Sequence, residues 1–258
     1  MNIFDFVLLI ILKPVYILYG KILEKKVKKG KMPRHIGIIM DGNRRYAEFF
    51  GMRPWEGHHR GADKLEEILD WANELGIDIV TVYAFSTENF KRSKEEVDHI
   101  MNLFEKKFKD LAEDKRVHKN KIKVRAIGNL AMLPEEVRKS IKIAEKATEN
   151  YSDKGLNICI AYGGRIEIVE AVKRIIERGV SPEDITMEMI KDNLYTGDLP
   201  DPDLIIRTGG EVRLSNFLLF QSAYSELFFT EIYFPAFRKI DFLRIIREYQ
   251  MRNRKFGR

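Results

Sequence analysis

An aspartate, a glycine, an asparagine and two arginines follow one another at residues 41–45, directly after an apolar run at 36–40. The apolar run is typical of a strand buried on both faces, and the polar residues suit a turn that opens a helix. A helix N-terminus favours phosphate even before Arg44 and Arg45 add their charge. Asp41 would repel phosphate, and a divalent cation that bridges its carboxylate to the phosphates resolves this conflict. The segment therefore predicts a site for a highly charged anion.

Four further polar and glycine-containing blocks follow along the chain. They are Gly57-His58, Tyr83-Ala-Phe85-Ser86-Thr-Glu-Asn89-Phe90-Lys-Arg92, Ala161-Tyr162-Gly163-Gly164-Arg165 and Asp203-Leu-Ile-Ile-Arg207-Thr208-Gly209-Gly210-Glu211-Val-Arg213-Leu-Ser215-Asn216-Phe217. One block alone would be weak evidence, but all of them in this order are specific. From about residue 33 to its C-terminus, the chain resembles the cis-prenyltransferases, the family of undecaprenyl diphosphate synthase and dehydrodolichyl diphosphate synthase, and in particular their archaeal and eukaryotic branch.

The resemblance implies a transferase that condenses isopentenyl diphosphate repeatedly onto an allylic diphosphate, either farnesyl or geranylgeranyl diphosphate. Each step releases diphosphate and forms a cis double bond, and the long-chain polyprenyl diphosphate that results is the precursor of a glycosyl carrier lipid. Mg2+ is the implied cofactor and a homodimer the implied assembly. Two diphosphates must lie side by side, so a single basic cluster would not be enough. The sequence offers two, Arg44 with Arg45 and Arg207 with Arg213.

The resemblance also implies roles for individual residues. Asp41 would hold Mg2+ against the diphosphates and help the leaving group to depart. Asn89 and Ser86 would orient isopentenyl diphosphate and assist removal of a proton from its C2. The implied substrate-binding residues are Gly42, Asn43, Arg44 and Arg45 for the allylic diphosphate, Arg207, Arg213 and Ser215 for isopentenyl diphosphate, and His58, Phe85 and Arg92 as further contacts.

Glu226 is the implied second metal ligand, since in the family the equivalent acid reaches the metal and phosphates from the other subunit of a dimer. It stands in an aromatic run, where an unpaired carboxylate would be costly. The surrounding run from Phe217 to Phe229 holds more large apolar residues than a strand end needs for its own core. We therefore expect this run to form a homodimer interface.

Structural roles remain open for some of these residues. Asp41 also suits the N-cap of the helix that follows it. His58 also suits a structural hydrogen bond under Gly57. The apolar stripe at residues 97–111 has helical spacing that core packing alone explains, although in the family the equivalent helix lines a hydrophobic tunnel whose far end limits product length.

The chain departs from the pattern of many bacterial family members at four places. Arg44 stands where many have glycine, as in the eukaryotic and archaeal branch. An arginine that is common nearer the Gly-His pair is replaced by a segment containing Arg53, and a common histidine is Val212 here. Lys255-Phe256-Gly257 stands for an Arg-x-Gly element that reaches the partner's active site in some members. The roles of these positions therefore stay open.

Strand and helix patterns alternate along the chain, which predicts an α/β fold with a mainly parallel six-stranded sheet and helices on both faces. The resemblance adds the hydrophobic tunnel. Strands are expected at Ile36 to Met40, Ile79 to Phe85, Ile122 to Ile127, Leu156 to Tyr162, Leu204 to Arg207 and Glu231 to Phe234. Helices are expected at Ala62 to Leu75, Lys94 to Leu111, Pro134 to Glu149, Arg165 to Arg178, Met187 to Leu194 and Asp241 to Arg254. The polar blocks follow the carboxyl ends of strands, where ligands bind in such sheets.

The composition favours one catalytic domain at residues 33–258, preceded by an apolar and basic segment at 1–32. The chain has 258 residues, 45% of them hydrophobic, and no Pro/Gly/Ser-rich linker divides the matching region. Cys159 is the single cysteine and lies in a strand-like run. An internal disulfide and a cysteine metal site are excluded, and we expect a reducing cytosol.

The formal net charge is +6, and basic residues gather between Lys21 and Arg34, directly after an apolar stretch from Ile3 to Tyr19. That order suits a membrane surface better than nucleic acid. The apolar run from Phe6 to Leu12 is too short to span a bilayer, and no signal-peptide pattern is seen. We expect a cytoplasmic protein that is peripheral at the cytoplasmic face of the membrane. The alternative is a helix that packs on the protein's own surface.

Other classes of protein fit the sequence less well. It contains no GxxxxGK[ST] motif of a P-loop enzyme and no DDxxD motif of a trans-prenyltransferase. A non-catalytic subunit of the same family is the serious alternative, but such subunits lose the residues around Asp41 and Asn89, which this chain retains.

Overall fold

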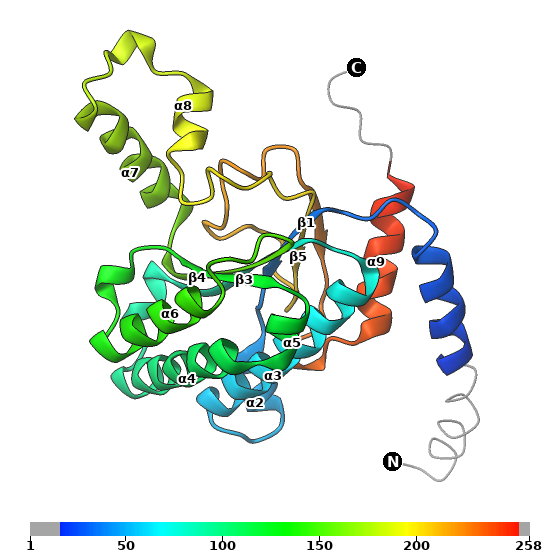
Figure 1. Cartoon of the computed structure of the whole chain (residues 1–258). Helices are drawn as coiled ribbons and strands as arrows, with labels where there is room; N and C mark the ends of the chain where they lie inside the picture. The colour runs from blue at the N-terminus through cyan, green and yellow to red at the C-terminus, as the bar shows by residue number, and fades with distance from the viewer. Residues whose placement is uncertain (1–15, 253–258) are drawn as a thin grey trace.

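The computed structural model describes residues 16–252 of the chain (Figure 1). Within these residues six strands form one sheet in the order β3-β4-β2-β1-β5-β6, and every neighbouring pair is parallel. The strands are β1 (His35–Ile39), β2 (Ile79–Ser86), β3 (Ile122–Ile127), β4 (Lys154–Tyr162), β5 (Leu204–Arg207) and β6 (Glu226–Phe229). The expected α/β fold with a six-stranded parallel sheet is confirmed.

The expected sixth strand at Glu231 to Phe234 is wrong. The four residues of β5 pair with Glu226–Phe229, so the ladder is complete before Glu231 is reached. The carbonyls of Ile232 and Thr230 accept hydrogen bonds from the N–H groups of Gly209 and Gly210 instead. Pro235 then supports the short 3-10 turn η4 (Phe234–Ala236), since proline suits a first helical turn and cannot donate to a ladder.

Helices cover both faces of the sheet (Figure 1). They are α2 (Asn43–Phe49), α3 (Pro54–Leu75), α4 (Lys94–Glu113), α5 (Lys115–Lys119), α6 (Glu135–Ala147), α7 (Gly164–Glu177), α8 (Met187–Asp192) and α9 (Lys239–Met251), with 3-10 turns η1 (Thr87–Lys91), η2 (Leu130–Met132) and η3 (Pro182–Asp184). A further helical segment covers residues 16–27 and lies beside α9. The α7 and α8 pair projects away from the sheet. Among the described residues, no helix is both long enough and apolar enough to cross a membrane.

Helix α3 begins eight residues before the expected start at Ala62. Pro54 occupies its first turn, and the backbone N–H of Arg53 donates to Glu56 Oε2 at 2.8 Å. Gly57 therefore lies inside the helix and not in a loop. A Cβ atom there would lie 2.1 Å from the Asn43 carbonyl oxygen, so glycine lets α3 approach the loop after β1 closely.

The buried His35 ring ties β1 to its neighbours. Its Nδ1 lies 2.7 Å from the Pro200 carbonyl and its Nε2 lies 2.7 Å from the Thr81 hydroxyl. A carbonyl only accepts, so Nδ1 donates to Pro200 and Nε2 of the neutral ring accepts from Thr81. Burial lowers the pKa of His35 below its usual 6.5, although the Pro200 hydrogen bond opposes this shift.

Acid should therefore destabilise the fold through His35. The unfolded chain takes up a proton near pH 6.5 and the folded chain does so only at lower pH, so stability is present above pH 6.5 and is lost as pH falls through the folded pKa. Each unit of pKa depression corresponds to about 1.4 kcal/mol. We expect the melting temperature to fall between pH 7 and pH 5, and His35→Gln to flatten that fall. An unchanged pH slope in the variant would assign the acid sensitivity to other groups, such as the partly buried His58, whose pKa is also lowered.

Candidate functional site

A polar cavity of about 770 Å3 lies at the carboxyl end of β1. Its walls carry four arginines, one histidine and three acids. The lining residues are Met40, Asp41, Gly42, Asn43, Arg44, Arg45, Glu48, Met52, Pro54, His58, Arg92, Glu211 and Arg213. The loops after β1 and β5 and the segment after β2 thus meet in one place, as expected for the carboxyl ends of parallel strands. Eight of the residues singled out from the sequence line this cavity.

Asp41 is held by both arginine-bearing loops. Its Oδ2 accepts from Arg207 Nη2 at 2.8 Å, and its Oδ1 accepts from the Gly42 N–H at 2.6 Å and from Arg45 Nη2 at 3.3 Å. The Thr208 hydroxyl donates to the Asp41 carbonyl at 2.7 Å and fixes the backbone as well. These contacts set the direction of the Asp41 carboxylate before any ligand arrives.

The interpretation of Asp41 as the helix N-cap is wrong. Helix α2 begins at Asn43, and its N-cap is Gly42 in the left-handed region with φ 99°. A side chain at Gly42 would be strained by this φ, and its Cβ would lie 2.8 Å from the Tyr233 ring. Glycine is therefore required where the chain turns from β1 into α2.

Arg207 shapes the loop after β5 and does not line the cavity. Its side chain is 5% exposed, and Nη1 donates to Ser215 Oγ at 2.7 Å and to the Arg213 carbonyl. Ser215 has a φ of 48°, which costs a non-glycine residue of order 1 kcal/mol. Arg207 thus holds Ser215 in this conformation and connects it to Asp41, while Arg213 faces the cavity.

Glu211 is a cavity acid that the sequence reasoning did not single out. It pairs with Arg213 at 2.7 Å and lies 3.9 Å from Arg45 Nη1. It therefore joins the arginines of the β1 loop to those of the β5 loop. Its position between Arg207 and Arg213 in the fifth block was the available signal.

A second, partly buried network joins His58, Arg92 and Glu96. Arg92 Nη1 donates to Glu96 Oε1 at 2.9 Å, and His58 Nε2 lies 3.2 Å from the same oxygen and 3.3 Å from Arg92 Nη1. One ring nitrogen can donate to Glu96 or accept from Arg92, but not both at once. Burial lowers the pKa of His58, against the opposing effect of Glu96, so the ring is neutral at pH 7.

Glu96 lies in the first turn of α4, three residues after the N-cap Ser93. Its backbone N–H does donate to Ser93 Oγ, at 3.3 Å. The carboxylate does not return to Ser93, as a capping box would require, because it pairs with Arg92 and His58. Tertiary contacts thus connect Glu96 to His58 and Arg92, which line the polar cavity.

Ser86, Asn89 and Phe85 lie outside the cavity lining. Asn89 Oδ1 accepts from the Ser86 N–H at 3.0 Å, which caps the 3-10 turn η1 at the end of β2. The Phe85 ring is buried and packs edge-on against Phe90 and Phe104. The structure therefore brings these residues to the correct end of the sheet but not into contact with the arginine cluster.

Glu226 lies at the amino end of the parallel strands, whereas Asp41 lies at their carboxyl end. It begins β6 and pairs with Leu204, the first residue of β5, whereas Asp41 follows the last residue of β1. Its carboxylate pairs with Arg252 at 2.7 Å. Within one chain this acid is directed away from the polar cavity.

The premise that the run from Phe217 to Phe229 exceeds the needs of its own core is wrong in part. Phe217, Leu218 and Phe228 are buried within the chain. Tyr224, in contrast, is 74% exposed.

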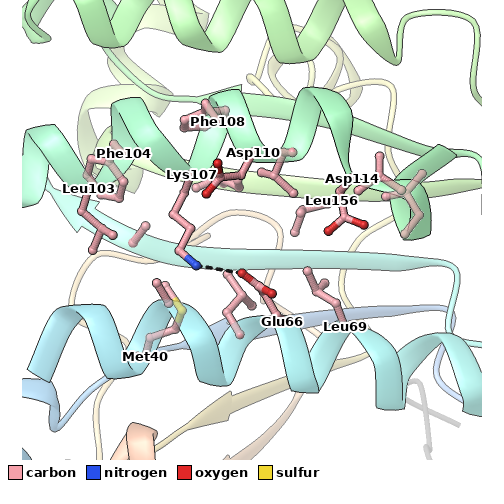
Figure 2. Close-up of a pocket in the computed structure, with 18 of the residues that line it drawn as sticks. Met40, Glu66, Leu69, Leu103, Phe104, Lys107, Phe108, Asp110, Asp114 and Leu156 are labelled. Atoms are coloured by element: carbon pink, nitrogen blue, oxygen red, sulfur yellow. Dashed lines mark hydrogen bonds and ion pairs between the residues drawn. The ribbon is translucent and has the colours of Figure 1, made fainter.

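An apolar cavity of about 130 Å3 lies between α3 and α4 (Figure 2). It shares Met40, Asn43 and His58 with the polar cavity, so the two cavities adjoin at these residues. Its apolar walls come from the sheet and from both helices. The apolar lining residues are Met40, Ala62, Leu65, Leu69, Ala84, Ile100, Leu103, Phe104, Phe108, Leu111, Val117, Ile122, Leu156 and Ile158. The stripe along α4 thus lines a cavity as well as packing in the core.

The described side chains do not form a complete metal-binding site by themselves. Among residues 16–252, no group of three or more His, Cys, Asp or Glu side chains is arranged to hold a metal. Mg2+ commonly binds through one or two carboxylates together with substrate phosphates and keeps several waters. The single carboxylate of Asp41 beside an arginine-lined cavity therefore fits a magnesium diphosphate, with phosphate oxygens completing the donor set.

Comparisons with known proteins agree with this geometry. A family model described as "Putative undecaprenyl diphosphate synthase" matches residues 39–257. The chain is 60% identical over 253 residues to a protein of Thermococcus kodakarensis named "Tritrans,polycis-undecaprenyl-diphosphate synthase (geranylgeranyl-diphosphate specific)", and the match covers 96% of each chain.

Two solved structures share the fold. Lavandulyl diphosphate synthase from Lavandula x intermedia, in complex with dimethylallyl diphosphate, superimposes with a TM-score of 0.82 at 37% identity over 88% of this chain and 99% of that chain. A probable undecaprenyl diphosphate synthase from Campylobacter jejuni superimposes with a TM-score of 0.74 at 36% identity over 88% of this chain and 100% of that chain. The chain therefore belongs to the cis-prenyltransferase family, the family of undecaprenyl diphosphate synthase.

Proposed function

We propose that this protein condenses isopentenyl diphosphate repeatedly onto an allylic diphosphate and releases a long-chain polyprenyl diphosphate, the precursor of a glycosyl carrier lipid. One observation carries the proposal: an arginine-lined polar cavity built on Asp41 adjoins an apolar cavity between α3 and α4. Charged heads and a hydrocarbon tail thus have adjoining compartments. Geranylgeranyl diphosphate is proposed as the primer over farnesyl diphosphate, because the Thermococcus relative is named for it.

In the proposed mechanism, the loop from Gly42 to Arg45 binds the allylic diphosphate. Arg213, with Arg207 and Ser215 shaping its loop, binds isopentenyl diphosphate. The planar guanidinium groups match phosphate oxygens in pairs and stay protonated. Asp41 would hold Mg2+, which when bound neutralises charge on the departing diphosphate.

The bond changes balance within the two substrates. The bond between C1 of the primer and its diphosphate breaks, and the oxygen keeps the electron pair. The double bond of isopentenyl diphosphate supplies the electron pair of the new carbon–carbon bond. A proton leaves its C2 for the released diphosphate, and the electron pair of that C–H bond forms the new double bond between C2 and C3. Asn89 and Ser86 are proposed to assist that step, with the turn η1 closing toward the bound substrate, and His58 and Arg92 contact diphosphate oxygens.

Labelled isopentenyl diphosphate tests this proposal. The purified protein is incubated with Mg2+ and either geranylgeranyl or farnesyl diphosphate, and the products are sized. We expect label in long-chain products, with faster incorporation from the geranylgeranyl primer. No extractable label with either primer would refute the function, and equal or faster use of farnesyl diphosphate would refute only the primer assignment.

A homodimer is part of the proposal. Glu226 lies at the amino end of its own sheet, away from Asp41 of the same chain. It can therefore approach an Asp41 site only if that site belongs to a second copy of the chain. β6 is an edge strand, and Tyr224 beside it is exposed. A two-fold axis beside β6 would reverse the direction of the partner's β6 relative to this one. The first residue of the partner's β6 would then lie toward the carboxyl end of this sheet.

Peripheral membrane binding is proposed for the N-terminal helix. The Leu23 and Val27 side chains are buried, so one face does pack on the protein's own surface. The opposite face exposes apolar side chains among several lysines. The exposed apolar residues of that face are Ile17, Leu18 and Ile22, whereas Tyr16 and Tyr19 lie on the packed side, where Arg238 and Arg244 stack over their rings. Such a face suits an anionic bilayer surface.

Deletion of residues 1–20 should reduce binding to anionic liposomes and leave turnover of short soluble primers unchanged. The deletion removes exposed apolar area while Leu23 and Val27 keep their packing. The paired substitution of Ile17 and Leu18 by serine tests the same face with the chain length unchanged. Sedimentation with anionic and with neutral vesicles measures binding, and undiminished binding of both variants to anionic vesicles would contradict the proposal.

A further inference from the structure

The outer wall of the apolar cavity contains a bridge of ion pairs between α3 and α4. Lys107 extends from α4 to Glu66 on α3, with Nζ 2.7 Å from Oε1 (Figure 2). Arg116, on α5, reaches the other carboxylate oxygen of Glu66 with Nη2 2.9 Å from Oε2. Both oxygens of one carboxylate thus hold two cations from the facing segment. We call Glu66, Lys107 and Arg116 the clasp.

The clasp belongs to the cavity and not merely to the surface. All three of its residues line the apolar cavity, as do the acids that surround Arg116. Arg116 also pairs with Asp114 at 2.7 Å and with Asp70 at 3.3 Å. The end of the cavity away from the arginine cluster is therefore lined by charge, whereas its middle is lined by leucine and phenylalanine side chains.

The clasp groups are charged at neutral pH and reach water on their outer side. Burial favours the neutral form of Glu66, but the hydrogen bonds from Lys107 and Arg116 outweigh it and lower the pKa of Glu66. The pKa of Lys107 is raised because pairing with Glu66 and Asp63 outweighs its burial. The side chains of Lys107 and Glu66 are 25% and 39% exposed. Ion pairs with this exposure are weak and are screened by salt.

The cavity is too small for the proposed product in its present shape. Its volume of about 130 Å3 lies well below the roughly 300–1,000 Å3 of ordinary small-molecule sites. A chain that lengthens by repeated condensation must therefore part α3 from α4. At the clasp the two helices are joined by weak ion pairs, so less apolar contact is lost there than along the leucine and phenylalanine positions.

We propose that the clasp of Glu66, Lys107 and Arg116 is a gate that determines product length, because its opening lets the growing hydrocarbon chain leave the cavity between α3 and α4. The inference rests on the proposed elongation of an allylic diphosphate. A closed clasp limits the chain to the space behind it. An open clasp removes that limit, and elongation continues.

Two variants and one matched control test the gate by product sizing. Glu66→Gln removes the charge that both cations share, and Lys107→Gln removes one cation should the first variant fold poorly. Glu105→Gln removes the i,i+4 pair with Lys109 on the same helix α4, away from the cavity. We expect both clasp variants to shift the product distribution to greater length by one or more isoprene units. Glu105→Gln should leave it unchanged.

Salt supplies a second readout that a merely structural ion pair would not move. Screening shortens from about 10 Å at 0.1 M salt to about 3 Å at 1 M. Unmodified protein should therefore give longer products at high salt, and Glu66→Gln should lose most of that dependence. Normal elongation with lengths unchanged by both variants and by salt overturns the gate alone. Absence of any prenyl product from the unmodified protein overturns the proposed function, and the gate with it.

Discussion

Replacement of Asp41 by alanine is expected to lower turnover about a thousandfold, which corresponds to about 4 kcal/mol of lost transition-state stabilisation. The carboxylate is the group proposed to join Mg2+ to the departing diphosphate, and Arg207 and Arg45 already fix its direction. Steady-state incorporation of labelled isopentenyl diphosphate measures the effect. The loss should appear in kcat, since Asp41 acts mainly on the charge that develops as the leaving group departs.

Two further variants separate this effect from damage to the fold. Asp41→Asn keeps the shape of the side chain and an oxygen for Arg207 but removes the charge, and it should lose nearly as much activity as the alanine variant. Asp78→Asn removes an exposed carboxylate at the amino end of the sheet, where Asp78 pairs with Arg34 at 3.7 Å. This control variant should remain active. Near-normal turnover of well-folded Asp41→Asn would refute the role given to this carboxylate.

Mixing two inactive variants should restore activity if Glu226 acts across a dimer. Asp41→Ala and Glu226→Ala homodimers each lack one acid at both sites. A mixed dimer has one site with both acids intact, so a statistical mixture should recover about a quarter of normal activity. Co-expression of the two variants with different affinity tags allows the mixed dimer to be purified. Its expected activity is about half of normal, because one of its two sites is intact.

Arg252 provides the matched control for Glu226. It is the partner of Glu226 within the chain, and its guanidinium also stacks on the Phe228 ring at 3.9 Å. If Glu226 serves only that ion pair, Arg252→Ala should lose as much activity as Glu226→Ala. If Glu226 serves a partner's site, Arg252→Ala should keep most of the activity. Verified mixed dimers without activity would argue against delivery of Glu226 by the second copy.

The parts of the fold that follow from local pattern could be predicted, and those decided by register could not. The runs at β1, β2, β4 and β5 are β-branched and apolar because both faces are buried. Glu226–Phe229 and the residues from Glu231 to Phe234 are similarly strand-like in sequence. Only pairing with the four residues of β5 selects the first of them.

The candidate site also contains residues that could be predicted from local sequence and residues that could not. Asp41, Arg45 and Arg213 could be brought together from the sequence, because their motifs follow the carboxyl ends of parallel strands. Glu96 and Glu211 were missed because their roles depend on partners far along the chain or on the fold of one loop, with Glu96 reaching His58 and Glu211 reaching Arg45. The clasp was missed for the same reason, since Glu66 and Lys107 look like ordinary exposed helix residues until α3 and α4 face each other.

The product of a single condensation decides whether this chain builds cis-polyprenyl diphosphates. Geranylgeranyl diphosphate is mixed with limiting labelled isopentenyl diphosphate and Mg2+, and the labelled product is isolated and analysed by NMR. One added isoprene unit with a cis double bond at the new position is expected from the unmodified protein, and no such product from Asp41→Asn. A trans double bond, or a labelled product formed equally by Asp41→Asn, would contradict cis elongation at the Asp41 site.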